Sequence, residues 1–128
     1  MVQLVLASAS PRREALLRQI GYQPIVSPAT VEEEIVREGE DPAQYVARQA
    51  CHKALDVARR HPDAAVLGAD TVVVLDQSII GKPVDVEHAK TTLRRLSGRK
   101  HLVYTGVAVF FDGQVQQFTV ATDVYMRQ

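Results

Sequence analysis

The sequence has little that would direct the protein out of the cytoplasm or onto a charged polymer. Its single cysteine, Cys51, cannot form an internal disulfide, and the N-terminal residues lack the basic and long apolar segments of a secretory signal. The 15 basic and 15 acidic residues cancel, which argues against broad attraction to nucleic acids or membrane surfaces. No apolar run reaches the roughly 20 residues that span a bilayer. We therefore expect a cytoplasmic protein that binds neither nucleic acid nor membrane.

The length favours one domain. A chain of 128 residues can bury one ordinary hydrophobic core, and it contains neither an internal repeat nor a low-complexity segment. We therefore interpret residues 1–128 as a single globular domain or a fragment of one.

The run from Ala65 to Leu75 is largely apolar and is interrupted by one carboxylate, that of Asp70. A continuous apolar run is typical of a strand covered on both faces, which places Asp70 at or near the core. Burial of an uncompensated carboxylate costs roughly several kcal/mol, so cations, a metal or hydrogen bonds should face it. Gly68 would let such a partner approach the backbone closely. The alternative is a strand end at which Asp70 turns to solvent or caps a turn.

A short apolar strand, residues 2–7, leads into a predicted helix. Ser10 is placed as its N-cap and Pro11 as its first residue. The helix should continue to about residue 20, where Gly21 ends it. Its expected buried stripe consists of Leu16, Leu17 and Ile20.

Arg12 and Arg13 fall in the first turn of this helix, where cations oppose the positive end of the helix dipole. Two arginines in that place favour an anionic ligand. With free backbone N–H groups and the small Ser8 and Ser10, they predict a phosphate-binding loop. The chain has no Walker A motif, because Gly81-Lys82 lacks the upstream glycine and the following Ser or Thr. Two solvated arginines on a surface helix are the alternative.

The middle of the chain predicts a short strand at residues 25–26 and a long helix. An acidic run, residues 32–34, lies between them and would ordinarily be solvated. Asp41 and Pro42 read as N-cap and first residue of the helix, which should reach about Arg60. Lys53 lies at the edge of the inward face, so its ammonium either points toward an anionic site or extends to solvent. The expected inward stripe consists of Val46, Ala50, Ala54, Val57 and Ala58.

The last third predicts a hairpin, a helix and two long strands. A turn at residues 76–78 returns the chain to Gly81-Lys82-Pro83, where the proline holds Lys82 at a defined place. An amphipathic helix from Val86 to Leu96 follows, with Ala89, Leu93 and Leu96 inward. Asp112-Gly113 is a strong hairpin signal between strands at 102–111 and 115–126.

Together these stretches supply four cations and two carboxylates at strand ends and loops. Such groups suit a triphosphate, because cations clamp its charges and a hard divalent ion takes carboxylate oxygens. One carboxylate can also orient or deprotonate a water for attack on phosphorus. The cations are Arg12, Arg13, Lys53 and Lys82, and the carboxylates are Glu33 and Asp70.

A set of motifs along the whole chain carries a resemblance. These motifs are Leu6-Ala7-Ser8-Ala9-Ser10-Pro11-Arg12-Arg13, Val31-Glu32-Glu33, Lys53-Ala54, Leu67-Gly68-Ala69-Asp70-Thr71-Val72, Gly81-Lys82-Pro83 and Leu96-Ser97-Gly98-Arg99, followed by His101, Val103 and Thr105-Gly106-Val107. On these residues the chain closely resembles the Maf family of nucleoside triphosphate pyrophosphatases, first named for inhibition of septum formation. The resemblance implies an α/β fold with a mixed central sheet flanked by helices, similar to the inosine-triphosphate pyrophosphatases, and a homodimer.

The resemblance also implies hydrolysis of a nucleoside triphosphate to the monophosphate and pyrophosphate by metal-assisted attack of water, with Mg or Mn. By this analogy Asp70 is the proton acceptor and, with Glu33, holds the metal. By the same analogy Ser8, Arg13, Lys53 and Lys82 bind the phosphates. We therefore expect Asp70, Lys53 and Lys82 to be the catalytic residues. The expected substrate-binding residues are Ser8, Ser10, Arg12, Arg13 and Thr71.

Two positions bear on the substrate. Arg12 and Thr71 resemble the branch that acts on dTTP, UTP and modified pyrimidine nucleotides, because the 7-methyl-GTP branch carries Trp and Gln there. Family members continue beyond the length of this chain, so we expect residues 1–128 to be C-terminally incomplete relative to the family.

Three other functions share parts of this pattern. A haloacid-dehalogenase phosphatase needs a second Asp two positions after Asp70, where this chain has Val72. A non-catalytic nucleotide-binding regulator of septum formation and cell division is the first remaining alternative to a dTTP/UTP pyrophosphatase. A preference for another base, such as that of 7-methyl-GTP, is the second.

Overall fold

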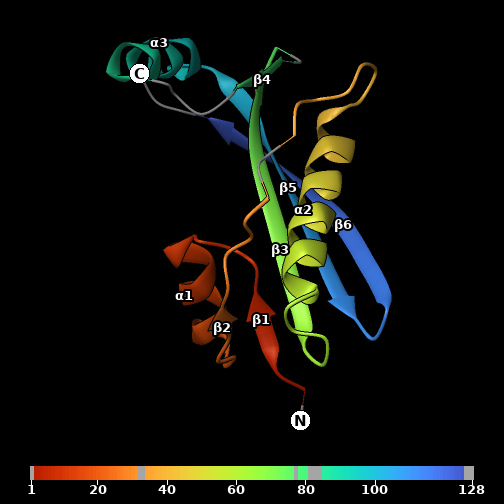
Figure 1. The fold of residues 1–128 in the computed structure, drawn as a ribbon. Coiled ribbons are helices and arrows are strands. Elements are labelled where there is room, and N and C mark those ends of the chain that lie inside the picture. Colours follow the sequence, from red (N-terminus) through yellow and green to blue (C-terminus); the bar gives the residue numbers. More distant parts are fainter. Residues whose placement is uncertain (1, 32–33, 77, 81–84, 126–128) are drawn as a thin grey trace.

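The structure, a computed structural model, describes residues 2–31, 34–76, 78–80 and 85–125. In these residues six strands form one sheet and three helices flank it (Figure 1). In chain order the elements are β1 (Leu4–Leu6), α1 (Pro11–Gln19), β2 (Ile25–Val26), α2 (Pro42–Ala58), β3 (Ala65–Leu75), β4 (Ser78–Ile80), α3 (Val86–Leu96), β5 (Lys100–Phe111) and β6 (Gln114–Tyr125). The expected mixed α/β architecture is confirmed.

The sheet has the order β2-β1-β3-β5-β6, and β4 pairs with the far end of β3. β1 runs parallel to β2 and β3, whereas β3 runs antiparallel to β4 and β5. β1 is short and pairs with only the beginning of β3, so the loop after β1 opens beside the middle of β3. That arrangement places the predicted phosphate-binding loop next to Asp70.

Helix α2 covers one face of the sheet. Asp41 caps it by accepting a hydrogen bond from the Gln44 backbone N–H, and the Gln44 side chain accepts one from the Asp41 N–H. All five residues of its predicted inward stripe are buried. Four of them, Ala50, Ala54, Val57 and Ala58, pack with Val5, Val66 and Ala108 of the strands to form the core.

Two strand glycines bring α2 unusually close to the sheet. A Cβ on Gly68 would meet the Ala50 carbonyl oxygen, and one on Gly106 would meet the Val46 carbonyl oxygen. Because neither glycine carries a side chain, the backbone of α2 rests directly on β3 and β5. We expected Gly68 to admit a partner of Asp70, and the structure shows that what it admits is the helix that carries this partner.

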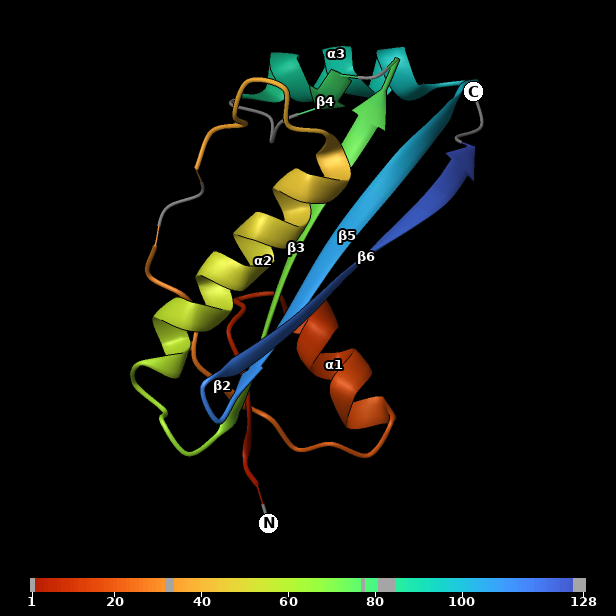
Figure 2. The same cartoon turned by 90° about the vertical axis from the view of Figure 1, so that its right-hand side faces the viewer.

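The opposite face of β3 is less covered than predicted. Figures 1 and 2 show α1 and α2 on opposite sides of β3, with α3 near the other end of the strand from α1. On the α1 side Thr71 is exposed and Val73 is half-buried, so the expectation of a strand covered on both faces is wrong over this stretch. An apolar run shows which side chains of a strand could be buried. Whether they are buried depends on the helices that pack on each face of the sheet.

Helix α1 begins and ends as predicted, with Ser10 as N-cap, Pro11 first and Gly21 at a φ of 102° beyond its end. Its predicted buried stripe is wrong, because no residue of α1 is buried and Leu16 and Ile20 are 55% and 69% exposed. Leu17 is half-buried. Helical spacing puts Leu16 and Leu17 on one face, but that face lines an open cavity instead of contacting the sheet.

The remaining predictions concern α3 and the hairpins. The bounds of α3 are confirmed, and Leu96 is buried and Ala89 half-buried, but Leu93 is 55% exposed and was wrongly assigned to the inward face. β5 and β6 join through Asp112 and Gly113 at φ values of 52° and 75°. Positive φ at both positions is the geometry of the predicted tight hairpin.

Candidate functional site

The loop after β1 is shaped by two serines. The hydroxyl of Ser8, which is buried, accepts hydrogen bonds from the Ser10 N–H at 3.1 Å and from Arg13 Nη1 at 3.3 Å. Ser10 accepts from the Arg13 backbone N–H at 3.4 Å and so caps α1. The strand end, the loop and the first turn of the helix therefore form one hydrogen-bonded unit at the positive end of α1.

Arg13 connects this loop to β3. Its Nη2 donates to Thr71 Oγ1 at 3.0 Å, while its Nη1 donates to Ser8. Thr71 Oγ1 lies 3.1 Å from Thr105 Oγ1 on β5. The guanidinium is thus oriented from both sides. The alternative of a freely solvated arginine does not hold for Arg13.

Asp70 is buried and lies beside a cation. Its side chain is 6% exposed, and its Oδ1 lies 2.8 Å from Lys53 Nζ, whose side chain is 23% exposed. The alternatives in which Asp70 turns to solvent or Lys53 extends away from the core are therefore wrong. The ammonium group offsets part of the cost of burying this carboxylate.

Two cavities meet at Arg13. The first, of about 380 Å³, lies between the loop after β1 and Lys53, and it is lined by Ser8, Ser10, Arg13, Pro28, Lys53 and Ala69 among others. The second, of about 500 Å³, shares Ser10, Arg13 and Ala69 and continues over the α1 side of the sheet. Its walls are mainly apolar, and it is lined in addition by Arg12, Leu16, Leu17, Leu67, Thr71, Thr105 and Val107. A polar, cationic cavity adjoining an apolar one suits an anion that is attached to a flat, less polar group.

A larger cavity of about 570 Å³ lies between α2 and β6. Arg48 is the one charged residue in its described lining, and that side chain is already held by Glu40 at 2.8 Å. None of the predicted site residues lines this cavity. We therefore place the candidate site at the two cavities beside Arg13.

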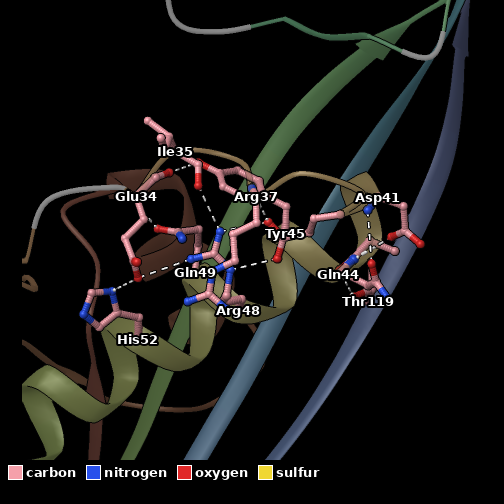
Figure 3. A network of polar contacts seen from close by, with 12 residues as sticks. Glu34, Ile35, Arg37, Asp41, Gln44, Tyr45, Arg48, Gln49, His52 and Thr119 are labelled. Carbon is pink, nitrogen blue, oxygen red and sulfur yellow. Dashed lines mark hydrogen bonds and ion pairs between the residues drawn. The ribbon is translucent and has the colours of Figure 1, made fainter.

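Hydrogen bonds and ion pairs hold the segment of residues 34–40 against α2, and we call this set of contacts the Arg48 network (Figure 3). Arg48 donates to both carboxylate oxygens of Glu40 at 2.8 Å and to the Ile35 carbonyl at 3.1 Å. The Tyr45 hydroxyl donates to the Glu34 carbonyl at 2.7 Å. The hydrogen bonds from the Arg48 side chain, and to a smaller extent the one from the Arg37 backbone N–H, lower the pKa of Glu40 from 4.5 to about 2. This network fixes the chain that follows the acidic run.

Sequence reasoning missed this network and the role of Thr105. Arg48 and Glu40 lie eight residues apart across a helix start, and no spacing rule connects them. Thr105 was part of a quoted motif, but only the register between β3 and β5 shows that it faces Thr71. A hydrogen-bond partner across two strands cannot be located until that register is known.

The predicted residues divide into three groups. The structure brings together Ser8, Ser10, Arg13, Lys53, Asp70 and Thr71, and Arg12 lines the adjoining cavity. Glu33 and Lys82 lie outside the described residues. Within the described ranges no group of three His, Cys, Asp or Glu residues could hold a metal ion by itself. A single carboxylate still fits Mg²⁺, which is commonly held by one or two carboxylates together with substrate phosphates.

The fold and the site define a class of protein: an α/β domain in which a strand–loop–helix cavity lined by Arg13 and Lys53 adjoins a buried lysine–carboxylate pair. The model of the family described as Maf-like protein matches residues 3–128. The chain therefore belongs to the Maf-like family, as the resemblance predicted. No helix in the described ranges is long and apolar enough to cross a membrane.

Several curated relatives are similar to this chain over most of its length. A protein of Symbiobacterium thermophilum named dTTP/UTP pyrophosphatase is 51% identical over 109 residues, which are 85% of this chain and 56% of the relative. Proteins with the same name from Myxococcus xanthus and Vibrio cholerae are 54% and 46% identical, over 83% and 98% of this chain and 54% and 67% of the relatives. The chain thus spans between about half and two thirds of the length of these relatives.

Solved structures are also similar in fold. The Ham1 protein of Staphylococcus aureus matches with a TM-score of 0.52 at 12% identity, over 94% of this chain and 70% of that one. At such low identity the similarity concerns the fold alone. It supports the predicted α/β architecture with a mixed central sheet.

Proposed function

We propose that this chain provides the phosphate-binding and catalytic groups of a pyrophosphatase that hydrolyses dTTP and UTP to the monophosphate and pyrophosphate. The observation that carries the proposal is the Lys53–Asp70 pair at 2.8 Å next to the cavity that Ser8 and Arg13 line. The names of the relatives, dTTP/UTP pyrophosphatase, support the substrate.

The polar cavity has the groups that bind a polyphosphate. Arg13 presents a planar guanidinium suited to paired phosphate oxygens, and its two bonds to Ser8 and Thr71 hold it in place before a ligand arrives. Lys53 adds a second positive charge in the same lining. Because these groups are oriented in advance, little reorganisation is needed when charge develops on the phosphates.

Asp70 is the group proposed to accept a proton from the attacking water. It is a buried carboxylate whose charge is compensated by Lys53, so it combines proton-accepting capacity with a fixed position. Lys53 has two roles in this proposal: its ammonium group pairs with Asp70, and it lines the cavity proposed to bind the phosphates.

We propose Mg²⁺ or Mn²⁺ as the cofactor. Asp70 is the described residue that would hold the ion, and phosphate oxygens of the substrate would supply further ligands. When bound, such an ion neutralises phosphate charge and activates water.

The second cavity is proposed to receive the nucleoside. Its apolar wall from Leu16, Leu67 and Val107 suits the face of a base, while Arg12 and Thr71 offer polar groups beside it. Because these two residues match the pyrimidine branch, we propose a preference for dTTP and UTP over 7-methyl-GTP.

The function is tested by incubating the purified chain with dTTP, UTP, ATP and 7-methyl-GTP in the presence of Mg²⁺ or Mn²⁺. Products are separated by anion-exchange chromatography. The proposal predicts that dTTP and UTP are each hydrolysed to a nucleoside monophosphate and pyrophosphate, with equal molar amounts of these two products. Orthophosphate with a diphosphate would mean attack at the terminal phosphorus and a different enzyme, and binding of dTTP without turnover would favour the nucleotide-binding regulator.

The cytoplasmic location and the homodimer remain predictions. Sedimentation equilibrium tests the dimer, because a mass near twice that of one chain is expected. A monomer at micromolar concentration would contradict it.

A further inference from the structure

Thr71 and Thr105 form a hydroxyl pair on the sheet face opposite α2. They are direct partners in the register of β3 and β5, and their Oγ1 atoms are 3.1 Å apart. Both line the cavity on the α1 side, together with Arg13. The pair therefore lines the second cavity beside Arg13, which both cavities share, and does not lie within the core.

The donor and acceptor capacities of these groups restrict what the pair can do. An arginine side chain only donates, so Thr71 Oγ1 accepts the bond from Arg13 Nη2 at 3.0 Å. A hydroxyl has one proton and two lone pairs. If Thr105 donates to Thr71, both lone pairs of Thr71 are used and its proton is directed elsewhere, toward an acceptor in the cavity. If Thr71 donates to Thr105 instead, that proton is withdrawn from the cavity.

We propose that Thr105 is a positioning residue for ligand binding, which acts through Thr71 on Arg13. Its hydroxyl sets the direction of the Thr71 proton and holds the oxygen that receives the Arg13 guanidinium. The inference rests on the proposed function for the identity of the natural ligand, a nucleoside triphosphate. The relay, meaning the chain of contacts from Thr105 through Thr71 to Arg13, rests on described residues and applies to any polyphosphate that Arg13 binds.

A double-mutant cycle tests the relay with two ligands, inorganic tripolyphosphate and dTTP, in buffer containing magnesium. Affinities are measured by isothermal titration calorimetry for Thr71→Val, Thr105→Val and the double variant. Valine keeps the branched shape of threonine and its preference for strands, so the fold is retained. Thr105→Val should weaken the binding of tripolyphosphate about three- to tenfold. A tenfold rise in the dissociation constant corresponds to about 1.4 kcal/mol.

The cycle separates positioning from a general structural role. If Thr105 acts through Thr71, the double variant should bind as weakly as Thr71→Val alone, because the second change removes a bond to a hydroxyl that is already absent. Thr105→Ser should bind within about twofold of wild type, since it restores the hydroxyl.

Thr119→Val is the matched control. This threonine lies on the neighbouring strand, where its hydroxyl donates to the Ala43 carbonyl of α2 at 3.1 Å. Its removal should lower the melting temperature without changing the affinity for either ligand. A fall in affinity as large as that of Thr105→Val would attribute both effects to loss of stability and overturn the inference.

Three further results would overturn it: wild-type affinity in Thr105→Val, additive losses in the double variant, or no tripolyphosphate binding by the wild type. The proposed function fails separately. A wild type that binds tripolyphosphate but releases no pyrophosphate from dTTP would refute the proposed function, while the cycle on tripolyphosphate would still decide the role of Thr105.

Discussion

Adding one methyl group at Gly68 should disturb both the stability and the chemistry of this protein. Helix α2 rests on β3 because Gly68 has no side chain, and the turn of that helix between Ala50 and Ala54 carries Lys53. In Gly68→Ala the new Cβ would lie 2.8 Å from the Ala54 nitrogen and closer still to the Ala50 carbonyl oxygen. Both are backbone atoms, so a side-chain rotation cannot relieve the contact.

The magnitude follows from the spacing. Non-bonded carbon contacts are optimal at about 3.5–4.0 Å, so α2 would have to retreat from β3 by about 1 Å. Overpacking of this kind costs about 1–3 kcal/mol. For a domain of this size we expect a fall in melting temperature of about 4–12 °C. A displacement of about 1 Å at the Lys53–Asp70 pair should also reduce turnover about tenfold to a hundredfold.

Thermal unfolding followed by circular dichroism and turnover of dTTP at 25 °C measure the two effects. Gly113→Ala is the control, because its added methyl meets open space in a hairpin turn distant from the site and strains only the backbone at a φ of 75°. It should lose about 1–2 kcal/mol of stability with normal turnover. A Gly68→Ala variant with wild-type stability and turnover would refute the close packing of α2.

Three further predictions concern charge. Lys53→Met should lower the free energy of unfolding in urea by about 3 kcal/mol at pH 7, because Asp70 is 6% exposed and loses a cation at 2.8 Å, and Lys53→Arg should recover part of it. Arg48→Met should lower the melting temperature most above pH 4.5. The pKa of Glu40 is lowered from 4.5 to about 2, so its interaction with Arg48 stabilises the fold fully above pH 4.5, and this stabilisation is lost as the pH falls through 2. An equally large difference in melting temperature between the wild type and Arg48→Met near pH 2 would contradict this account. Removal of divalent ions with EDTA should abolish pyrophosphate release, and Mg²⁺ or Mn²⁺ should restore it; turnover in EDTA would exclude the metal.

Local signals in the sequence predicted the elements well. Ser10 and Pro11 define the start of α1, Asp41 and Pro42 that of α2, and Asp112-Gly113 the long hairpin, because capping and turn chemistry act within a few residues. The inward stripe of α2 was also correct, since it packs directly on the sheet.

Contacts between distant elements were less accessible. Leu16 and Ile20 have helical spacing yet face open space, because periodicity identifies a shared face but not what lies against it. Asp70 was predicted to need a compensating partner, and Lys53 was one of several candidates until the fold brought α2 across β3. The Thr71–Thr105 pair and the Arg48 network depend on register and loop path, which no local pattern encodes.

The most direct test of the central claim is Asp70→Asn, measured for binding and turnover in the same preparation. The substitution keeps the size of the side chain and removes its charge. We predict a dTTP dissociation constant within a few-fold of wild type by calorimetry, and a loss of pyrophosphate release greater than about a hundredfold, as expected for removal of a general base. Pyrophosphate release at the wild-type rate from Asp70→Asn would contradict the account.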